Sequence, residues 1–589
     1  MPSSRPEPTA SDPAATGRRT LARRTLLTAA GVAGAAGATT GLGAVLHADG
    51  EPAGAATPAA PSTPSAAAPT APAPAGPSPA GTTLESVAAP RGTTGYRRLG
   101  AGPGWPRVVR EELAPAGRRR EEKRTVLLSF VHLTDAHLID VQHPVRFEYL
   151  RATEPRAWRP QEALTVHGLV SMVERINALR GGPATGAPLD FAMTTGDNTD
   201  NNCRAEVEWF LTAMSGGRIT PNTGDPGGYE GVQDSGLPLY WQPEKPLDGI
   251  DRRHGLPHLP GFLDAATGRL TSPGLGIPWY STVGNHDNLV GGHYAVDPYF
   301  AELAVGDRKL YELPAAEAAA MRASISAGTD TRGSALRRLL RGHARRMRTV
   351  TPDPARVPLT NRQYAEAHLD PAYTGPGPAG HGYTAESVAE GRLYYSFRAP
   401  GNASGSAAGN VVGISLDTTN PDGDHRGHLA APQLRWLDRE LTRHRDDHVL
   451  VFSHHPSTST PVGGDALLAV LERHPNVVAW LNGHSHRNRI RPRGHFWEIT
   501  TASHVDHPQL ARVVELADNG DGTLSLFTTC VESAAPYAAE PGDLSPAALA
   551  SRYRELAFNA PGRLDILAGE PGDRNTELLL RRRHRHAGR

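Results

Sequence analysis

The chain has 589 residues, which is enough for one large domain or for more than one. Its 61 lysine and arginine side chains balance 61 aspartate and glutamate side chains, so the formal net charge is zero. This balance gives no electrostatic reason to expect nucleic acid as a partner. Cys203 and Cys530 lack the spacing of a metal motif, and the sequence leaves open one disulfide or two free thiols.

Residues 1–49 have the organisation of an export signal. Arg23-Arg24 precede a weakly apolar run, rich in Ala and Gly, that ends near Leu46, and a second pair, Arg18-Arg19, leaves the register open. The segment resembles a twin-arginine signal, which implies the twin-arginine translocase as a partner during export. The expected location is extracellular or associated with the cell envelope. An uncleaved membrane anchor is the alternative, but the glycine content disfavours a permanent span.

The composition changes twice more along the chain. Residues 50–82 are Ala, Pro, Ser and Thr with almost no large apolar residue, so we expect a disordered linker. The folded domain is predicted over residues 83–570, and residues 571–589 are predicted to be a basic tail. No stable membrane span is expected after the signal is cleaved, because no later segment is long and apolar enough.

Five short apolar runs, rich in β-branched or aromatic residues, each end in a polar turn. The runs cover residues 125–131, 191–195, 278–283, 449–452 and 477–481. Helical patterns at 166–179, at 432–441 and from Ser545-Pro546 onward accompany them. Strands that alternate with helices indicate an α/β layered domain, in which ligands bind beyond the carboxyl ends of the strands. We therefore expect the five polar turns to meet at one edge.

Two long stretches interrupt this alternation, near residues 212–276 and 289–391. The second contains a basic helical pattern at 334–348, and a predicted strand pair at 393–397 and 411–416 then returns to the core. Insertions of this length are usually functional or mobile. Two interpretations stay open: a lid or rim over the site, or additions that do not contact the substrate.

The polar turns are rich in Asp, Asn and His. In chain order they are Asp135-Ala136-His137, Gly196-Asp197-Asn198, Gly284-Asn285-His286-Asp287, His454-His455 and Gly483-His484-Ser485-His486. Each motif alone is common, but the five in this order resemble the pattern of the calcineurin-like metallophosphoesterases. The resemblance spans roughly residues 125–500. It implies two packed mixed β-sheets flanked by helices, with long insertions, in a twin-arginine-exported branch of that family.

The resemblance also implies a centre of two metal ions. Asp135, His137, Asp197 and His486 would bind one ion, and Asp197, Asn285, His454 and His484 the other, with Asp197 as the bridge. Such ligands suit Mn, Fe or Zn. A metal-bridging hydroxide would attack phosphorus, His286 would act as general acid, and Asp287 would orient His286. His455 is the alternative to His454 as ligand, and Asn198 and His455 are weaker candidates for substrate binding.

The implied activity is metal-dependent hydrolysis of phosphate mono- or diesters, in a small molecule, a lipid or a wall polymer. A catalytically inactive, ligand-binding relative is the alternative, and an interaction module whose insertions matter more than its metals is a third hypothesis. Every expected position of the site is filled, which argues against the inactive relative. Purple acid phosphatases have a tyrosine where this chain has Asp200, and they lack the equivalent of His137, so an iron–tyrosinate centre is not expected.

Overall fold

Two β-sheets form the centre of residues 76–400 and 410–582, the part of the chain that this computed structural model describes. The larger sheet has the order β3 (Val108–Arg110), β19 (Thr576–Arg581), β18 (Thr523–Val531), β17 (Ala511–Asp518), β4 (Thr125–Leu133), β5 (Phe191–Thr195) and β8 (Trp279–Thr282). The smaller sheet has the order β11 (Tyr395–Arg398), β12 (Val411–Ser415), β13 (His448–Phe452), β14 (Val477–Asn482), β16 (Phe496–Thr500) and β15 (Arg489–Arg493). The predicted export signal and most of the predicted linker lie outside the described residues.

Both sheets are mixed, and they pack against each other. The runs β4-β5-β8 and β12-β13-β14-β16 are parallel, whereas β17 pairs antiparallel with β4 and with β18. One apolar cluster contains side chains of both sheets, and the rings of Phe130 in β4 and Phe452 in β13 meet edge to face at 5.9 Å. Burial of these inner faces is what holds the two layers together.

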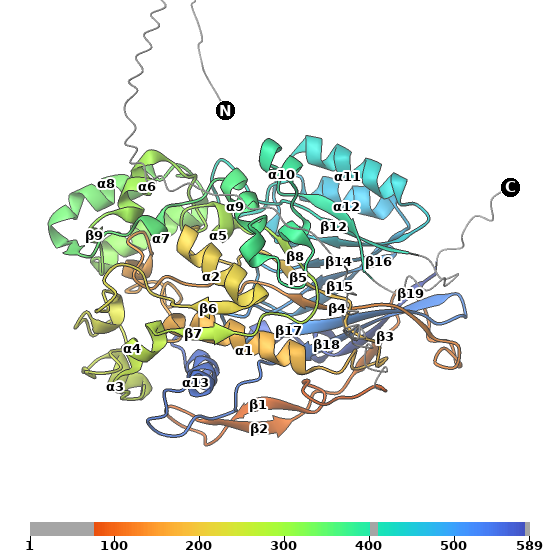
Figure 1. Ribbon diagram of the computed structural model, residues 1–589, viewed down its shortest axis with the longest axis horizontal. Coiled ribbons are helices and arrows are strands. Elements are labelled where there is room, and N and C mark those ends of the chain that lie inside the picture. Colours follow the sequence, from red (N-terminus) through yellow and green to blue (C-terminus); the bar gives the residue numbers. More distant parts are fainter. Residues whose placement is uncertain (1–75, 401–409, 583–589) are drawn as a thin grey trace, which may run out of the picture. The chain divides into compact units, whose positions relative to one another are not determined.

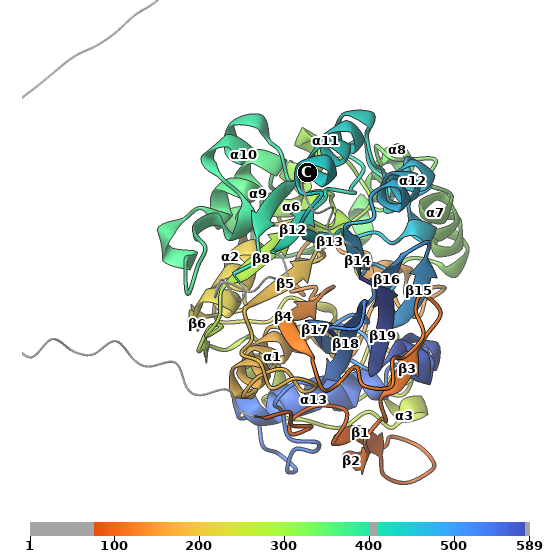
Figure 2. The ribbon, with the colours of Figure 1, turned by 90° about the vertical axis from the view of Figure 1, so that its right-hand side faces the viewer.

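Helices cover the outer faces of the two sheets (Figures 1 and 2). Those beside the larger sheet include α1 (Thr165–Ala178), α2 (Arg204–Ser215) and α13 (Pro546–Phe558), and those beside the smaller sheet are α11 (Ala431–Arg443) and α12 (Gly464–Arg473). In α1 the buried residues Leu169, Met172, Val173 and Ile176 repeat at helical spacing. The predicted fold, two packed mixed sheets flanked by helices, is confirmed.

The five predicted strands exist, and their carboxyl ends lead into the polar turns. Three of them, β4, β5 and β8, are neighbours in the larger sheet, and β13 and β14 are neighbours in the smaller one. Because the three strands are parallel to one another and so are the two, the turns after them lie at one edge of the two-layer core. The predicted strand pair at 393–397 and 411–416 is also present, as the antiparallel strands β11 and β12.

The end of the fold differs from the sequence prediction. Residues 576–581, assigned to a basic tail, form β19, which lies between β3 and β18 inside the larger sheet. Leu578, Leu579 and Leu580 are buried there, and the arginine run that suggested a tail starts only at the last residue of the strand. Cys203 and Cys530 are both buried free thiols, which settles the open alternative against a disulfide between them.

Both long insertions are folded. The first contains β6 (Gly217–Ile219), α3 (Ile250–His254), α4 (Phe262–Thr267) and β7 (Leu270–Ser272). The second contains α6 (Pro298–Val305), β9 (Arg308–Lys309), α7 (Ala315–Ala327), α8 (Ser334–Gly342), β10 (Arg348–Thr349), α9 (Asn361–His368) and α10 (Ala385–Glu390). The remaining strands and α-helices within the described residues are the hairpin of β1 (Ser86–Pro90) and β2 (Leu99–Pro103) and the short helix α5 (Asn285–Asn288).

The insertions pack on residues 139–164, which connect β4 to α1 and are called the rim segment below. Trp241 and Phe262 of the first insertion share an apolar cluster with Trp158 of the rim segment. Tyr294 and Phe300 of the second insertion share another cluster with the rim residues Val145, Tyr149 and Leu150. The insertions therefore support a loop that the core sheets alone leave uncovered.

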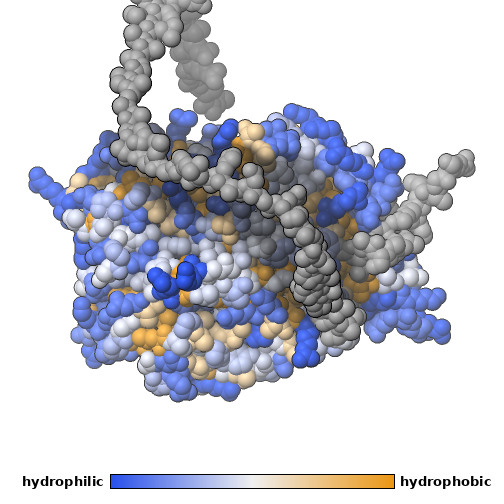
Figure 3. All heavy atoms as spheres, in the orientation of Figure 1, coloured by the Kyte–Doolittle hydropathy of each residue, from blue (hydrophilic) through white to orange (hydrophobic). Residues whose placement is uncertain are grey.

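No helix within the described residues has the length and apolar character needed to cross a bilayer. The face drawn in Figure 3 is mainly hydrophilic, with apolar residues scattered over it.

Lys309 joins the second insertion to the rim segment by a buried ion pair. Its Nζ lies 2.8 Å from Oε1 of Glu148, and both side chains are fully buried. The same Nζ donates to the carbonyl oxygens of Val141 and His143, at 3.1 and 3.0 Å. These contacts fix the backbone of the rim segment at both ends of a tight turn.

We expect Lys309→Met to lower the free energy of unfolding by roughly 3 kcal/mol, because it removes one of the two cations paired with the buried Glu148 and leaves the carbonyl oxygens of Val141 and His143 without their donor. Arg308→Met is the matched control: Arg308 is the neighbour of Lys309 in β9, and its guanidinium donates to the carbonyl of Ala344 at an exposed site. Urea unfolding of both variants measures the difference. Equal midpoints for the two variants would contradict the assignment of Lys309 as a structural cation.

Candidate metal centre

The five polar turns bring two groups of ligand atoms together. In the first group, Nε2 of His454 lies 3.1 Å from Oδ2 of Asp197 and 3.1 Å from Oδ1 of Asn285. Nδ1 of His484 lies 3.2 Å from the same His454 nitrogen. Ligands around a cation with bonds of about 2.1 Å are separated by about 3 Å, so these four side chains have the spacing of one coordination sphere.

The second group lies on the other side of Asp197. Nε2 of His486 is 3.3 Å from Oδ1 of Asp135, and Nε2 of His137 is 3.6 Å from Oδ2 of Asp197. That Asp197 oxygen thus belongs to both groups, as a bridging carboxylate requires. Nε2 of His137 is buried without a hydrogen-bond partner among the described residues, which a cation in this position would correct. The residues therefore fit two divalent cations.

The ligand residues have an unusual backbone. Positive φ angles occur at Asp135 (52°), His137 (43°), Asp197 (50°), His484 (62°) and His486 (55°). Left-handed conformation costs an L-residue roughly 1–2 kcal/mol, and such residues concentrate at functional sites. Most of the predicted ligands are therefore held in a conformation that the chain would avoid without the surrounding packing.

Hydrogen bonds from outside the centre orient three of the imidazoles. Nδ1 of His137 contacts Oδ1 of Asp200 at 3.0 Å, and Nδ1 of His486 contacts Oδ2 of Asp506 at 2.6 Å. Nδ1 of His454 contacts the backbone carbonyl of Thr195 at 2.8 Å. Because each acceptor takes the proton on Nδ1, each Nε2 is the nitrogen that can offer a lone pair to a metal ion once the ring is neutral.

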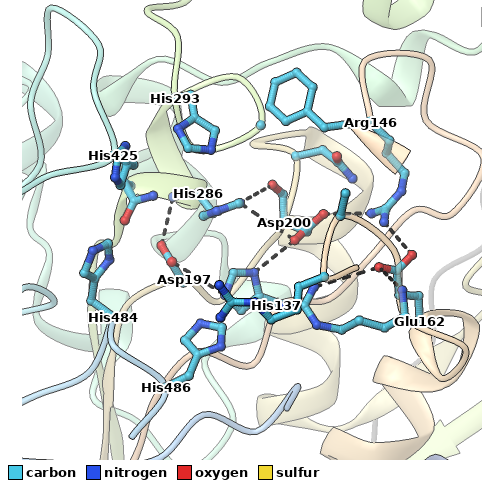
Figure 4. A pocket seen from close by; sticks show the side chains of 17 residues that line it. His137, Arg146, Glu162, Asp197, Asp200, His286, His293, His425, His484 and His486 are labelled. Carbon is cyan, nitrogen blue, oxygen red and sulfur yellow. Dashed lines mark hydrogen bonds and ion pairs between the residues drawn. The ribbon is translucent and has the colours of Figure 1, made fainter. Parts of the chain in front are cut away.

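Arg146 connects this site to the rim segment (Figure 4). Its guanidinium contacts Oδ2 of Asp200 at 2.7 Å, Oε2 of Glu148 at 2.8 Å and Oε2 of Glu162 at 2.5 Å. Burial alone would raise the pKa of Asp200, but Arg146 and the His137 hydrogen bond hold this pKa well below its usual range. Asp200 therefore stays ionised and acts as an acceptor only.

A second arginine has the same role on the other side of the centre. Arg159 contacts both carboxylate oxygens of Asp506, at 2.6 and 3.1 Å. Burial would raise the pKa of Asp506, whereas Arg159 and His486 lower it well below its usual range. Arg146, Arg159, Asp200 and Asp506 are functional residues that the motifs did not reveal. Arg146 and Arg159 lie in a stretch rich in charged residues between the first motif and α1, whereas no motif marks Asp506.

The structure places His286 at the pocket and corrects the predicted role of Asp287. Nδ1 of His286 contacts the backbone carbonyl of Asp200 at 2.6 Å, so Asp200 and not Asp287 orients this ring. Asp287 instead accepts from the backbone nitrogens of Gly284 and Thr199, at 2.8 and 2.9 Å. Burial, and then the Asp197 carboxylate, raise the pKa of Asp287 to about 7. Through these hydrogen bonds Asp287 stabilises the turn that carries Asn285 and His286.

Asn198 and His455, predicted as weak substrate contacts, lie behind the pocket. Nδ2 of Asn198 donates to the carbonyl of Thr282 at 3.1 Å and to Oη of Tyr364 at 3.0 Å. The ring nitrogens of His455 contact Oγ1 of Thr418 at 2.9 Å and the carbonyl of His425 at 3.0 Å. Neither side chain lines the cavity, because both form hydrogen bonds to neighbouring segments instead.

A cavity of about 240 Å³ opens over the two ligand groups. Besides site residues it is lined by Arg146, Phe147, Arg156, Ala157, Arg159 and Glu162 of the rim segment, and by Asn201, Gly291, His293 and His425. The first insertion contributes no residue to this lining, and the second contributes only Gly291 and His293. The wall of the pocket is the rim segment, and the insertions act mainly from behind it.

Sequence comparisons with known proteins match only a limited part of the chain. No family model matches. A manganese-dependent ADP-ribose/CDP-alcohol diphosphatase of Danio rerio is 38% identical over 98 residues, which cover 15% of this chain and 28% of that protein. The protein of the same name from Xenopus tropicalis is 36% identical over 72 residues, 11% of this chain and 21% of that protein. The chain thus matches about a quarter of the length of these curated relatives.

Among solved structures, a dimetal phosphatase from Danio rerio aligns with a TM-score of 0.30 and 11% identity, over 69% of this chain and 100% of that chain. The names of the two curated relatives support the resemblance to metallophosphoesterases that the five motifs carry.

We expect metal binding to release protons and to strengthen as the pH rises. Burial would lower the pKa of His454 and of His486, but Asp197 raises the first to about 9 and Asp135 raises the second to about 10. In the metal-free chain both rings are therefore protonated below these values, and a cation must displace both protons. For each proton that the metal ion displaces, the apparent affinity for the metal should fall about tenfold when the pH falls by one unit.

Calorimetric titration of the metal-free chain with Mn²⁺ at pH 7, in two buffers of different ionisation enthalpy, counts the released protons. A binding heat that is the same in both buffers would show that these imidazoles are already neutral.

Proposed function

We propose that this protein is a metal-dependent phosphoesterase that uses two divalent cations to hydrolyse phosphate esters. The observation that carries the proposal is the convergence of seven candidate ligand side chains, from five separate turns, into two groups that share the Asp197 carboxylate. Two adjacent centres of oxygen and imidazole ligands, with no thiolate, are typical of hydrolytic dimetal sites.

Manganese is the first candidate for both cations. The donor set of carboxylate, amide and imidazole suits Mn, Fe or Zn, and the two curated relatives are named as manganese-dependent. Bound cations would neutralise the phosphate oxygens and make water a stronger nucleophile. The protein's own contribution is to hold the ligands in place and to supply a proton.

His286 is the residue that can supply this proton. Because its Nδ1 donates to the carbonyl of Asp200, its Nε2 faces the cavity and carries a second proton when the ring is charged. From there it can donate to the leaving oxygen of the ester. Gly292 lies against this ring so closely that a Cβ atom at that position would overlap it. The tight packing keeps the imidazole in one orientation.

Small molecules with a phosphate diester or diphosphate linkage are the first substrates to consider. The curated relatives are named for ADP-ribose and CDP-alcohols, which contain a diphosphate. Arg156 is available to a second phosphate at the cavity: its side chain is 51% exposed, and Glu154 is 3.7 Å away. Lipid and wall-polymer esters remain part of the proposal, as does export through the twin-arginine translocase, which rests on Arg23-Arg24.

A catalytically inactive ligand-binding protein is the alternative. That hypothesis requires a missing ligand or a displaced acid, but five of the seven candidate ligands and His286 line one cavity, and the other two, Asp135 and His454, contact ligands that line it. The geometry therefore favours the enzyme.

We expect the full chain to hydrolyse ADP-ribose or CDP-choline with Mn²⁺ and to be inactive with EDTA. Bis-p-nitrophenyl phosphate and p-nitrophenyl phosphate, assayed beside them, separate diesterase from monoesterase activity. Asp197→Ala should lose activity, because it removes the shared ligand, and Asp248→Ala, at an 88% exposed carboxylate, is the control. Full activity of the wild-type chain after exhaustive removal of metal would falsify the proposal.

We expect His286→Ala to retain both metal ions and to lose about 100-fold or more in kcat, with the larger loss on esters that have a poor leaving group. Its ring is not needed for the ligand groups, whereas its proton is needed at the leaving oxygen. Elemental analysis gives the metal content, and His258→Ala, at an exposed histidine, is the control. Loss of metal together with activity would instead make His286 a ligand.

A further inference from the structure

A second cavity, of about 310 Å³, lies outside the metal centre and is lined by arginines from three distant parts of the chain. Arg97 comes from the loop between β1 and β2, Arg253 from α3 in the first insertion, and Arg563 from the segment after α13. Figures 1 and 2 both show these elements on the same side of the molecule. The volume is within the range of small-molecule sites, about 300–1,000 Å³.

The lining of this cavity contains no carboxylate. The guanidinium of Arg253 is exposed and has no hydrogen-bond or ion-pair partner among the described residues. The guanidinium of Arg97 lies 4.7 Å from the ring centroid of Phe558, and that of Arg563 lies 4.1 Å from the same centroid. Arg563 also contacts Asp565, but that carboxylate is 78% exposed. Positive charge therefore exceeds negative charge around the cavity.

Three guanidinium groups around one cavity repel each other, and an anion between them would offset this cost. The Phe558 ring holds two of the groups by cation–π contacts, so they are positioned before any ligand arrives. The same positive surroundings act on His254, whose pKa is lowered by burial and by the charges of Arg151 and Arg253. Guanidinium groups match the paired oxygens of phosphate better than those of small spherical anions.

We propose that this second cavity is a binding site for a phosphate group, distinct from the metal centre. Its position gives the site a link to the catalytic cavity. A Cβ atom at Gly562, which lines the second cavity, would lie 2.8 Å from Cβ of Pro155 and 3.5 Å from Cγ of Arg156. Arg156 lines the catalytic cavity, so a short piece of the rim segment separates the two sites.

The phosphate can be carried by a soluble molecule or by a lipid headgroup. Leu564 and Ile566, which follow Arg563 in the chain, are 39% and 55% exposed. Exposed aliphatic side chains beside a cationic pocket suit the interface of an anionic bilayer. The chemistry recognised in the pocket is the same in both cases, and an experiment with two arms distinguishes the sources.

The first arm titrates the manganese-loaded full chain with inorganic phosphate in a calorimeter. We expect Arg253→Ser to weaken one binding event about tenfold or more. Arg252→Ser is the matched control, because Arg252 is the exposed neighbour in α3, pairs with Asp248 at 3.3 Å and does not line the cavity. The second arm measures co-sedimentation of the same three proteins with phosphatidylglycerol vesicles and with phosphatidylcholine vesicles.

A loss confined to Arg253→Ser in the first arm identifies a site for soluble phosphate, and a loss confined to it on phosphatidylglycerol identifies a headgroup site. The proposal is overturned if Arg253→Ser behaves like Arg252→Ser in both arms. Failure of the proposed catalysis is separate. If the metal centre binds no phosphate, the wild-type chain should show one phosphate-binding event instead of two. Arg253→Ser should still weaken that event about tenfold or more.

Discussion

The buried contacts of Arg146 with Asp200, Glu148 and Glu162 fix the position of the candidate metal centre relative to the rim segment. A carboxylate this deeply buried is costly unless a cation pairs with it, and one guanidinium serves three of them. Through Asp200 the same contact reaches His137, a candidate metal ligand, and His286, the proposed proton donor. The geometry of the site thus depends on a residue that is not one of the seven candidate metal ligands.

The long insertions contribute to this geometry. The rim segment that carries Arg146 has no strand or long helix of its own, and it needs packing on its outer side. The insertions supply that packing through two apolar clusters and through Lys309, which neutralises Glu148 in turn. The support therefore extends from β9 through Glu148 and Arg146 to the centre, and the insertions affect the site without lining much of it.

The motifs in the sequence predicted the fold, and they predicted which side chains lie together at the site, because both depend on short-range patterns. Each ligand follows a buried strand directly, so its position could be inferred from the strand that precedes it. The partners of these ligands could not be inferred in this way. Asp506 lies 20 residues beyond His486, and the role of Asp287 depends on backbone nitrogens that no side-chain pattern reveals. The strand β19 was missed because a basic run adjoins it.

The left-handed backbone at the candidate ligand residues lowers the stability of the fold while it places the side chains that the site needs. Glycine adopts this conformation without a steric cost, so replacing Asp135, His137 or His484 by glycine would relieve strain while removing a metal ligand. Selection of variants for thermal stability alone, in the absence of metal, would therefore tend to erase the centre, even though the sheets beneath it stayed intact. Only selection that includes metal or turnover would keep these residues.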